Sequence, residues 1–268
     1  MVINSFQRAS ISFLGILVVF WTYLYLNNIT EGFYNYLYSF LFGLIPLFSG
    51  IIAMFGAKKW GGLRSAIGKA VFFIGLGIFF WGCGETAWSY YNFVLGIAAP
   101  YPSIADLGFA PSIFFYGLGA VYLSRATGAK FGLRNKYAKV FAIVSPMVIL
   151  ILSYYALVTI ARGGVLVTTD ETPLKMVLDI VYPLGDFLGL TIAAVISGLS
   201  FRYLGGRYTI DIIAILLGLA VMFAADFIFS YTTTIGTYYN ADIGDLVLTI
   251  GLFLLSFGAL GFSNLKES

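Results

Sequence analysis

Residues 208–235 read YTIDIIAILLGLAVMFAADFIFSYTTTI, an apolar stretch whose only charged side chains are Asp211 and Asp226. A helix rises about 1.5 Å per residue, so a helix of this length exceeds the roughly 30 Å of hydrocarbon in a bilayer. A membrane β-strand would be shorter and would alternate in polarity at every second residue. The stretch therefore predicts a transmembrane helix and an all-α membrane protein.

The same pattern recurs along the whole chain. Of its 268 residues, 60% are hydrophobic and 10% are charged, and the mean hydropathy is +0.94, whereas soluble domains carry about 25% charged residues. The eight apolar runs cover about 10–27, 33–55, 68–94, 106–124, 138–161, 174–201, 208–235 and 241–263. The connecting segments are too short for a soluble domain. We therefore expect one polytopic integral membrane helical bundle over 1–268, with the lipid bilayer as its main partner.

Basic residues define the expected orientation, because lysine and arginine are retained on the cytoplasmic side of a membrane. The two termini and every second connection lie on the same side of the membrane. Of the 15 lysines and arginines, all but Arg162 and Lys175 fall in or beside these segments. We therefore predict a multi-pass protein of the cell membrane with its N-terminus and C-terminus in the cytoplasm. The basic segments are expected to serve as topology signals at anionic headgroups or as a docking surface for a cytoplasmic partner.

Acidic residues show the opposite distribution. Apart from Asp211 and Glu267, the 12 Asp and Glu residues fall in the expected outer loops or inside apolar runs. A carboxylate that faces lipid is energetically costly, so the embedded acids are expected to face the bundle interior or a wet cavity, paired or protonated. Acids that are embedded or at the outer rim are Glu85, Asp106, Asp186, Asp226 and Asp245.

An internal repeat relates the two halves of the sequence. At a shift of 141 residues, GIFFWGCGETAWSY at 77–90 aligns with GLAVMFAADFIFSY at 218–231 and pairs Glu85 with Asp226. Because the copies lie four helices apart, both have the same direction through the membrane, and an axis along the membrane normal would relate them. The sequence therefore predicts a 4+4 parallel repeat. Its copies are expected over about 10–125 and about 138–263.

The alignment extends beyond these two helices. At a shift of 139 residues, Asp106 aligns with Asp245, and both are expected at the outer start of a helix. A looser match lays the second apolar run over the sixth and places Phe42 opposite Asp186. Carboxylates at helix starts either cap the helix or contribute to a site.

Aromatic residues accompany the acids. Trp81, Glu85 and Trp88 recur at helical spacing on one face of the third run, and Tyr91 follows closely. Ring faces and carboxylates both attract cations. The candidate ligand-binding residues are therefore Glu85, Asp226, Trp81, Trp88, Tyr91, Asp106, Asp186 and Asp245. The alternatives are an interfacial aromatic belt for Trp88 and Tyr91 and a hydrogen-bonded structural role for the two embedded acids.

A longer motif in this region resembles a known kind of membrane module. The matching residues are Gly84, Glu85, Trp88, Tyr91, Pro100, Pro102, Ser103, Ala105, Asp106 and Pro111, within about 70–125. This pattern resembles the amino-terminal multi-helix sensor modules of bacterial diguanylate cyclases and sensor kinases, and related stand-alone archaeal and bacterial membrane proteins. Glutamate stands at position 85 where aspartate is more usual. The resemblance implies a sensory function.

The chain lacks residues that several classes of protein need for their function. The chain has no histidine and one cysteine, Cys83, so the commonest general base and metal ligand are missing. No cofactor, metal or nucleic-acid motif is identified. An enzyme is disfavoured, although Asp186, Asp226 and Asp245 include carboxylates that are able to activate water.

Three functions remain as hypotheses. The first is a receptor-like or accessory module that binds a small cationic or amphiphilic ligand in an outward-facing acidic, aromatic cavity and signals to a cytoplasmic protein. The second is a secondary transporter of a cation, an amine or protons, with Glu85 and Asp226 as paired protonatable sites. The third is a structural subunit of a larger membrane complex.

Overall fold

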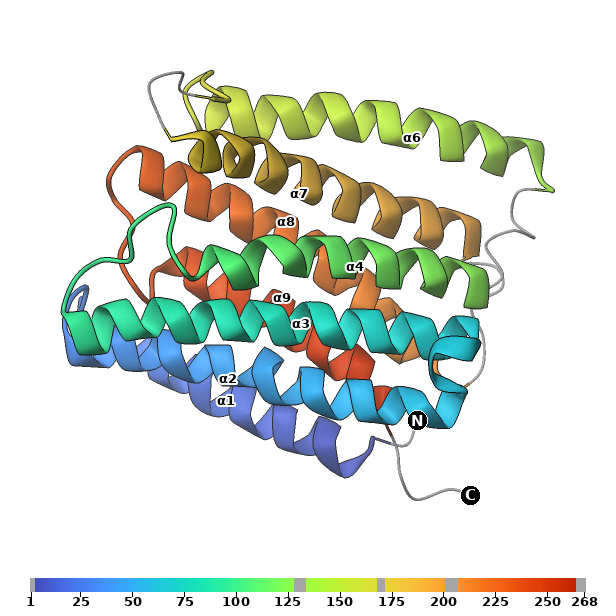
Figure 1. Ribbon diagram of the computed structural model, residues 1–268, viewed down its shortest axis with the longest axis horizontal. Coiled ribbons are helices and arrows are strands. Elements are labelled where there is room, and N and C mark those ends of the chain that lie inside the picture. The colour runs from blue at the N-terminus through green and yellow to red at the C-terminus, as the bar shows by residue number, and fades with distance from the viewer. Residues whose placement is uncertain (1–2, 128–133, 168–171, 201–206, 264–268) are drawn as a thin grey trace.

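Eight long helices make up most of the computed structural model (Figure 1), which describes residues 3–127, 134–167, 172–200 and 207–263. Each of the eight is long and apolar enough to cross a membrane. They are α1 (Ser5–Leu26), α2 (Phe33–Gly56), α3 (Ala66–Tyr90), α4 (Asp106–Ala126), α6 (Lys136–Tyr154), α7 (Pro173–Ser200), α8 (Thr209–Thr234) and α9 (Ile243–Gly261). The prediction of eight long, apolar helices is confirmed.

Shorter helical segments extend or connect these helices. A π-helical segment, Tyr91–Leu95, continues α3, and another, Tyr155–Ile160, continues α6. Two short 3-10 turns, Ala57–Trp60 and Gly62–Arg64, connect α2 to α3.

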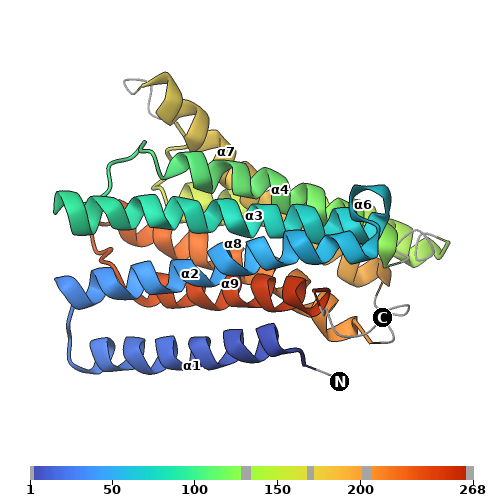
Figure 2. The same ribbon diagram turned by 60° about the horizontal axis from the view of Figure 1, so that its bottom comes forward.

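Six helices pack in a closed ring. Around it the neighbours are α2, α3, α4, α7, α8 and α9, and α9 returns to α2. The other two helices lie outside the ring, α1 against α2 and α9 and α6 against α7, at opposite edges of the molecule (Figure 1). Figure 2 shows α1 set apart below α2 and α9. Large apolar side chains on these outer helices are exposed, for example Val19 at 71% and Ile151 at 68%, as expected for surfaces that face lipid.

Glycines bring neighbouring helices of the ring close together. A Cβ at Gly108 of α4 would overlap the backbone of Gly84 and the carbonyl of Phe80, both on α3. A Cβ at Gly258 of α9 would likewise overlap the carbonyl of Asp211 on α8. Small residues at such crossings allow tight helix packing where lipid provides no hydrophobic drive for association.

The two ends of the bundle differ in charge. At one end, which we call the acidic end, α2, α4, α7 and α9 begin and the other four helices end (Figure 1). Here lie Asp106, Asp179, Asp242 and Asp245, whereas Lys58, Lys59, Arg64, Lys69 and Arg125 lie at the opposite, basic end. The candidate acids are thus gathered within and beside the acidic half of the ring.

Candidate functional site

A hydrogen-bonded network surrounds Asp245 at the start of α9. Asp242 caps the helix, because its Oδ1 accepts the N–H of Asp245 at 3.0 Å. Asp245 Oδ2 in turn accepts the N–H of Ala241 at 2.7 Å and the hydroxyl of Ser39 from α2 at 3.4 Å. The hydroxyl of Tyr238 donates to Asp245 Oδ1 at 3.5 Å. Asp245 therefore both stabilises the helix start and lies inside the bundle, where its side chain is 3% exposed.

Glu85 approaches this network from α3. It is 5% exposed and packs so closely against α2 that a Cβ at Gly43 would lie 2.6 Å from Glu85 Cγ. Its charge interacts with Asp245 and with Tyr238. Among the residues that the structure describes, Glu85 has neither a hydrogen-bond donor nor an ion-pair partner for its carboxyl. Buried polar groups are normally hydrogen-bonded, so this carboxyl is available to a ligand.

Three aromatic rings lie beyond Glu85 toward the acidic end. Trp88, one helical turn along α3, has its ring centre 6.3 Å from that of Tyr238 and 6.2 Å from that of Phe229 on α8. The Trp88 Nε1–H donates to Asn240 Oδ1 at 3.1 Å, which fixes the indole in place. We call Glu85, Asp245, Trp88 and Tyr238 together the Glu85 site. It combines two carboxyls with two ring systems.

Burial also determines the protonation of the loop residues at this site. It raises the pKa of Tyr238 well above its usual value, and the nearby charges of Asp245 and Glu85 act in the same direction. The phenol therefore stays protonated and donates to Asp245. Burial raises the pKa of Asp242 as well, although backbone N–H groups at the start of α9 oppose that change.

Asp226 belongs to a second group of acids on the other side of the ring. Its carboxyl on α8 pairs with that of Asp186 on α7 through a side-chain hydrogen bond. Tyr182, one turn from Asp186, donates its hydroxyl to Asp106 Oδ1 at the start of α4. Asp106 Oδ2 accepts the N–H of Ser103 at 2.7 Å. We call Asp226, Asp186, Tyr182 and Asp106 the Asp226 site.

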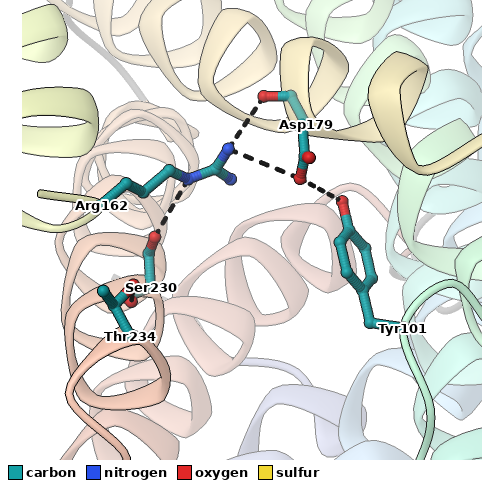
Figure 3. Close-up of polar contacts among 5 residues, drawn as sticks. All are labelled: Tyr101, Arg162, Asp179, Ser230 and Thr234. Carbon is teal, nitrogen blue, oxygen red and sulfur yellow. Dashed lines mark hydrogen bonds and ion pairs between the residues drawn. The ribbon is translucent and has the colours of Figure 1, made fainter. Parts of the chain in front are cut away.

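A polar network covers the acidic end next to the Asp226 site (Figure 3). Arg162 Nη1 lies 3.7 Å from Asp179 Oδ1 and donates to the Asp179 carbonyl at 3.0 Å, and Arg162 Nε donates to Ser230 Oγ at 3.3 Å. Tyr101, from the segment between α3 and α4, donates to Asp179 Oδ1 at 3.0 Å. The network joins segments next to α4, α6, α7 and α8, so it holds these elements together.

The structure divides the predicted residues into these two groups. Glu85, Asp245 and Trp88 lie together, and so do Asp226, Asp186 and Asp106. Glu85 and Asp226, which the repeat aligns, therefore each have a different carboxyl as neighbour. Trp81 is deeper in the core, with its ring centre 5.7 Å from that of Phe42 and 5.1 Å from that of Phe109. Tyr91 packs edge-on against Tyr90, with ring centres 6.2 Å apart.

Sequence reasoning did not identify several residues that build the two sites. Tyr238 and Asn240 lie in a loop whose course the apolar pattern does not determine, and Ser39 is an ordinary hydroxyl within an apolar helix. Arg162 gave a usable signal, because it is one of two basic residues on the expected outer side. The structure shows that it binds Asp179.

The donor set of the Glu85 site suits an organic or monovalent cation better than a tightly held metal ion. No group of three or more Asp, Glu, Cys or His side chains able to hold a metal occurs in the described part of the chain. A separate cavity of about 180 Å³ lies at the basic end and is mainly apolar, with Ile74, Leu123, Ile215 and Phe262 among its lining residues.

No family model, characterised protein or solved structure matches the chain. Its function is therefore inferred from the chemistry and geometry of the two acidic sites.

Proposed function

We propose that this membrane protein binds a small cation, in particular an organic amine, at the Glu85 site. The observation that carries the proposal is the buried, unpartnered carboxyl of Glu85 beside a second carboxyl, that of Asp245. Among the described residues no basic side chain is paired with either carboxyl, and inside a low-dielectric bundle two such carboxyls attract a cation strongly.

The aromatic residues favour an organic cation over a bare ion. The polar atoms of Trp88 and Tyr238 are already bound to Asn240 and Asp245, which orients both rings. Ring faces attract quaternary and primary ammonium groups, most strongly where water is excluded. A carboxyl on one side and rings on the other would hold such a group without a metal-like ligand set.

The proposed biological context is a receptor-like or sensory module of the cell membrane. Positively charged segments at the basic end favour a cytoplasmic position for that end, so the Glu85 site would lie toward the outside. The resemblance of the 70–125 region to sensor modules supports the same function. The helices run the length of the bundle and so connect the Glu85 site to the basic segments. Occupancy of the site would be communicated through those segments to a cytoplasmic signalling protein.

We also propose that the bundle is a 4+4 duplication. In such a duplication α2 corresponds to α7 and α4 corresponds to α9. The order of helices in the ring supports it, because α2 contacts α9 and, correspondingly, α7 contacts α4. Asp106 and Asp245 support it too, since each binds a loop N–H with one oxygen and a tyrosine hydroxyl with the other. Asp186 then takes the place of Phe42, which accounts for the carboxyl from α7 that pairs with Asp226.

Equilibrium binding to the purified full-length chain tests the proposed function. Tetramethylammonium chloride is the probe, titrated against sodium chloride at equal ionic strength, with tryptophan fluorescence and the thermal unfolding temperature as readouts. We expect saturable binding to the unmodified protein and at least tenfold weaker binding to Glu85→Gln.

A control variant separates the site from a general effect of removing a buried acid. Asp211 is also a buried carboxyl, 8% exposed, but it lies at the basic end of α8 and is bound to Gln7 Nε2 at 2.7 Å. We expect Asp211→Asn to bind the probe like the unmodified protein. Equal binding to Glu85→Gln and to the unmodified protein would refute the proposal.

A second candidate function, proton-coupled transport, rests on the Asp226 site. A hydrogen bond between Asp186 and Asp226 requires one shared proton, because two carboxylates only accept. Such a pair can take up and release a proton as its neighbours move. The test is cation-driven proton flux into proteoliposomes that contain a pH dye. Proton flux that occurs in the unmodified protein and is abolished by Asp226→Asn would support transport. If the unmodified protein shows no flux, the protein binds a cation without transporting protons.

A further inference from the structure

At the basic end, one tyrosine ring lies against two cations from different helices. Lys69 Nζ of α3 is 5.1 Å from the centre of the Tyr122 ring, and Arg125 Cζ of α4 is 5.2 Å from it. Within residues 3–127, 134–167, 172–200 and 207–263, neither cation forms an ion pair with a carboxylate. The two positive charges therefore repel each other, and an anion bound between them would relieve that repulsion.

Stacked rings continue from Tyr122 along the contact between α3 and α4. Tyr122 stacks on Phe73 with ring centres 5.8 Å apart, Phe73 on Phe115 at 6.3 Å, and Phe115 on Phe80 at 5.3 Å. All four residues are half-buried, so each remains partly accessible at the molecular surface. We call Tyr122, Phe73, Phe115 and Phe80 the aromatic ladder.

The rise from Lys69 to the far end of the aromatic ladder matches one leaflet of a bilayer. From Lys69 to Phe80, α3 rises about 16 Å at about 1.5 Å per residue. The hydrocarbon core of a bilayer is roughly 30 Å thick, so one leaflet takes about half of that. Lys69 and Arg125 lie at the headgroup end of this length, where long basic side chains reach the interface.

We propose that Lys69 and Arg125 bind the phosphate of an anionic phospholipid whose acyl chain lies along the aromatic ladder. Charge complementarity selects the headgroup, and the apolar rings select a lipid over a soluble phosphate. This site is distinct from the Glu85 and Asp226 sites, which are at the other end of the bundle. It would fix a lipid of the leaflet that faces the basic end to the α3–α4 pair.

Native mass spectrometry of the full-length chain tests this site. The probes are dioleoylphosphatidylglycerol and dioleoylphosphatidylcholine, which have the same acyl chains and differ in net charge. We expect one phosphatidylglycerol molecule to be retained preferentially by the unmodified protein. In the double variant Lys69→Gln, Arg125→Gln that preference should fall roughly 30-fold, as expected for two lost basic contacts of about 1 kcal/mol each.

The double variant Lys58→Gln, Arg64→Gln is the matched control. It removes the same charge from the same end of the bundle but leaves the ladder and its two cations in place, so the lipid preference should persist. An equal loss in both double variants would overturn the proposal in favour of a diffuse electrostatic attraction.

A variant of the ladder itself provides an independent test. Phe115→Leu keeps both cations and should weaken retention of phosphatidylglycerol several-fold. Unchanged retention in Phe115→Leu would refute a role for the rings. Displacement of the lipid by inorganic phosphate at a similar concentration would refute the choice of a phospholipid over a soluble anion.

Discussion

Glu85→Gln separates a ligand-binding carboxyl from a structural one, because the two roles predict opposite changes in stability. The amide has the same shape but no charge. Within the described part of the chain Glu85 has no hydrogen-bond donor to lose, and it lies close enough to Asp245 for the two carboxyls to repel each other when ionised. Replacement by glutamine therefore removes a repulsion and the cost of burying an ion, and leaves an unpaired amide that costs about 1–3 kcal/mol. We expect the ligand-free variant to be as stable as the unmodified protein or slightly more stable.

Binding should change in the other direction. A unit charge about 4–6 Å from a bound cation contributes about 3–4 kcal/mol at an effective dielectric constant near 20. The glutamine oxygen retains part of that attraction as a dipole, so we expect affinity for tetramethylammonium to fall about 10- to 100-fold.

Thermal unfolding in detergent, with and without tetramethylammonium, measures both effects in one assay. The variant should unfold at the same temperature as the unmodified protein or higher without the probe, and should lose most of the probe-induced increase. A structural carboxyl in a buried pair would instead cost about 3–5 kcal/mol on removal. At about 2–4 °C per kcal/mol, that is a decrease of roughly 10 °C. Such a decrease with unchanged binding would refute the reasoning.

Three further predictions concern the framework around the sites. Gly108→Ala should destabilise the bundle by about 3 kcal/mol, because its Cβ meets immobile backbone of α3. Gly117→Ala should be neutral or stabilising in the same unfolding assay, because its Cβ would meet no described atom within 4 Å beyond the adjacent backbone of its own helix. Arg162→Gln should cost about 1–2 kcal/mol in thermal unfolding, because it leaves the 8% exposed Asp179 without its cation. Asp242→Asn should gain stability relative to the unmodified protein as pH rises from about 4 to 7.

The sign of the pH prediction follows from the buried cap. Burial raises the pKa of Asp242 in the folded protein. Its contribution to the stability of the fold is therefore fully present below the unfolded-state pKa of about 4 and is lost as pH rises through the folded-state pKa. Asparagine caps a helix about as well as aspartate and does not ionise. A constant difference in unfolding temperature across that pH range would contradict this assignment.

Each of the other framework predictions has its own contrary result. Equal unfolding temperatures for Gly108→Ala and Gly117→Ala would show that α3 and α4 separate at little cost. An Arg162→Gln variant as stable as the unmodified protein would show that Tyr101 alone satisfies Asp179.

The helices could be predicted from the sequence because length and apolar character are local properties. The run expected at 106–124 is observed as Asp106–Ala126. The first run was expected to begin at residue 10, but α1 begins at Ser5. Asn4 and Gln7 extend it by a reciprocal cap, with hydrogen bonds of 2.9 and 3.1 Å. A window that averages hydropathy does not detect such polar caps.

The acids were identified from the sequence, but their grouping was not. Alignment of the repeat indicates that Glu85 and Asp226 have comparable depth, yet it does not say which helix is adjacent to which. Lateral neighbours depend on the order of the helices around the ring, and there Glu85 faces Asp245 whereas Asp226 faces Asp186. Tyr238 enters its site through the course of a loop, which the apolar pattern does not encode.

A high-resolution map of the protein in lipid nanodiscs, saturated with tetramethylammonium, tests the central claim most directly. We predict density for one cation between the carboxyls of Glu85 and Asp245, against the rings of Trp88 and Tyr238. Density at Asp186 and Asp226 instead, or an empty Glu85 site in a protein that binds the probe in solution, would contradict the account.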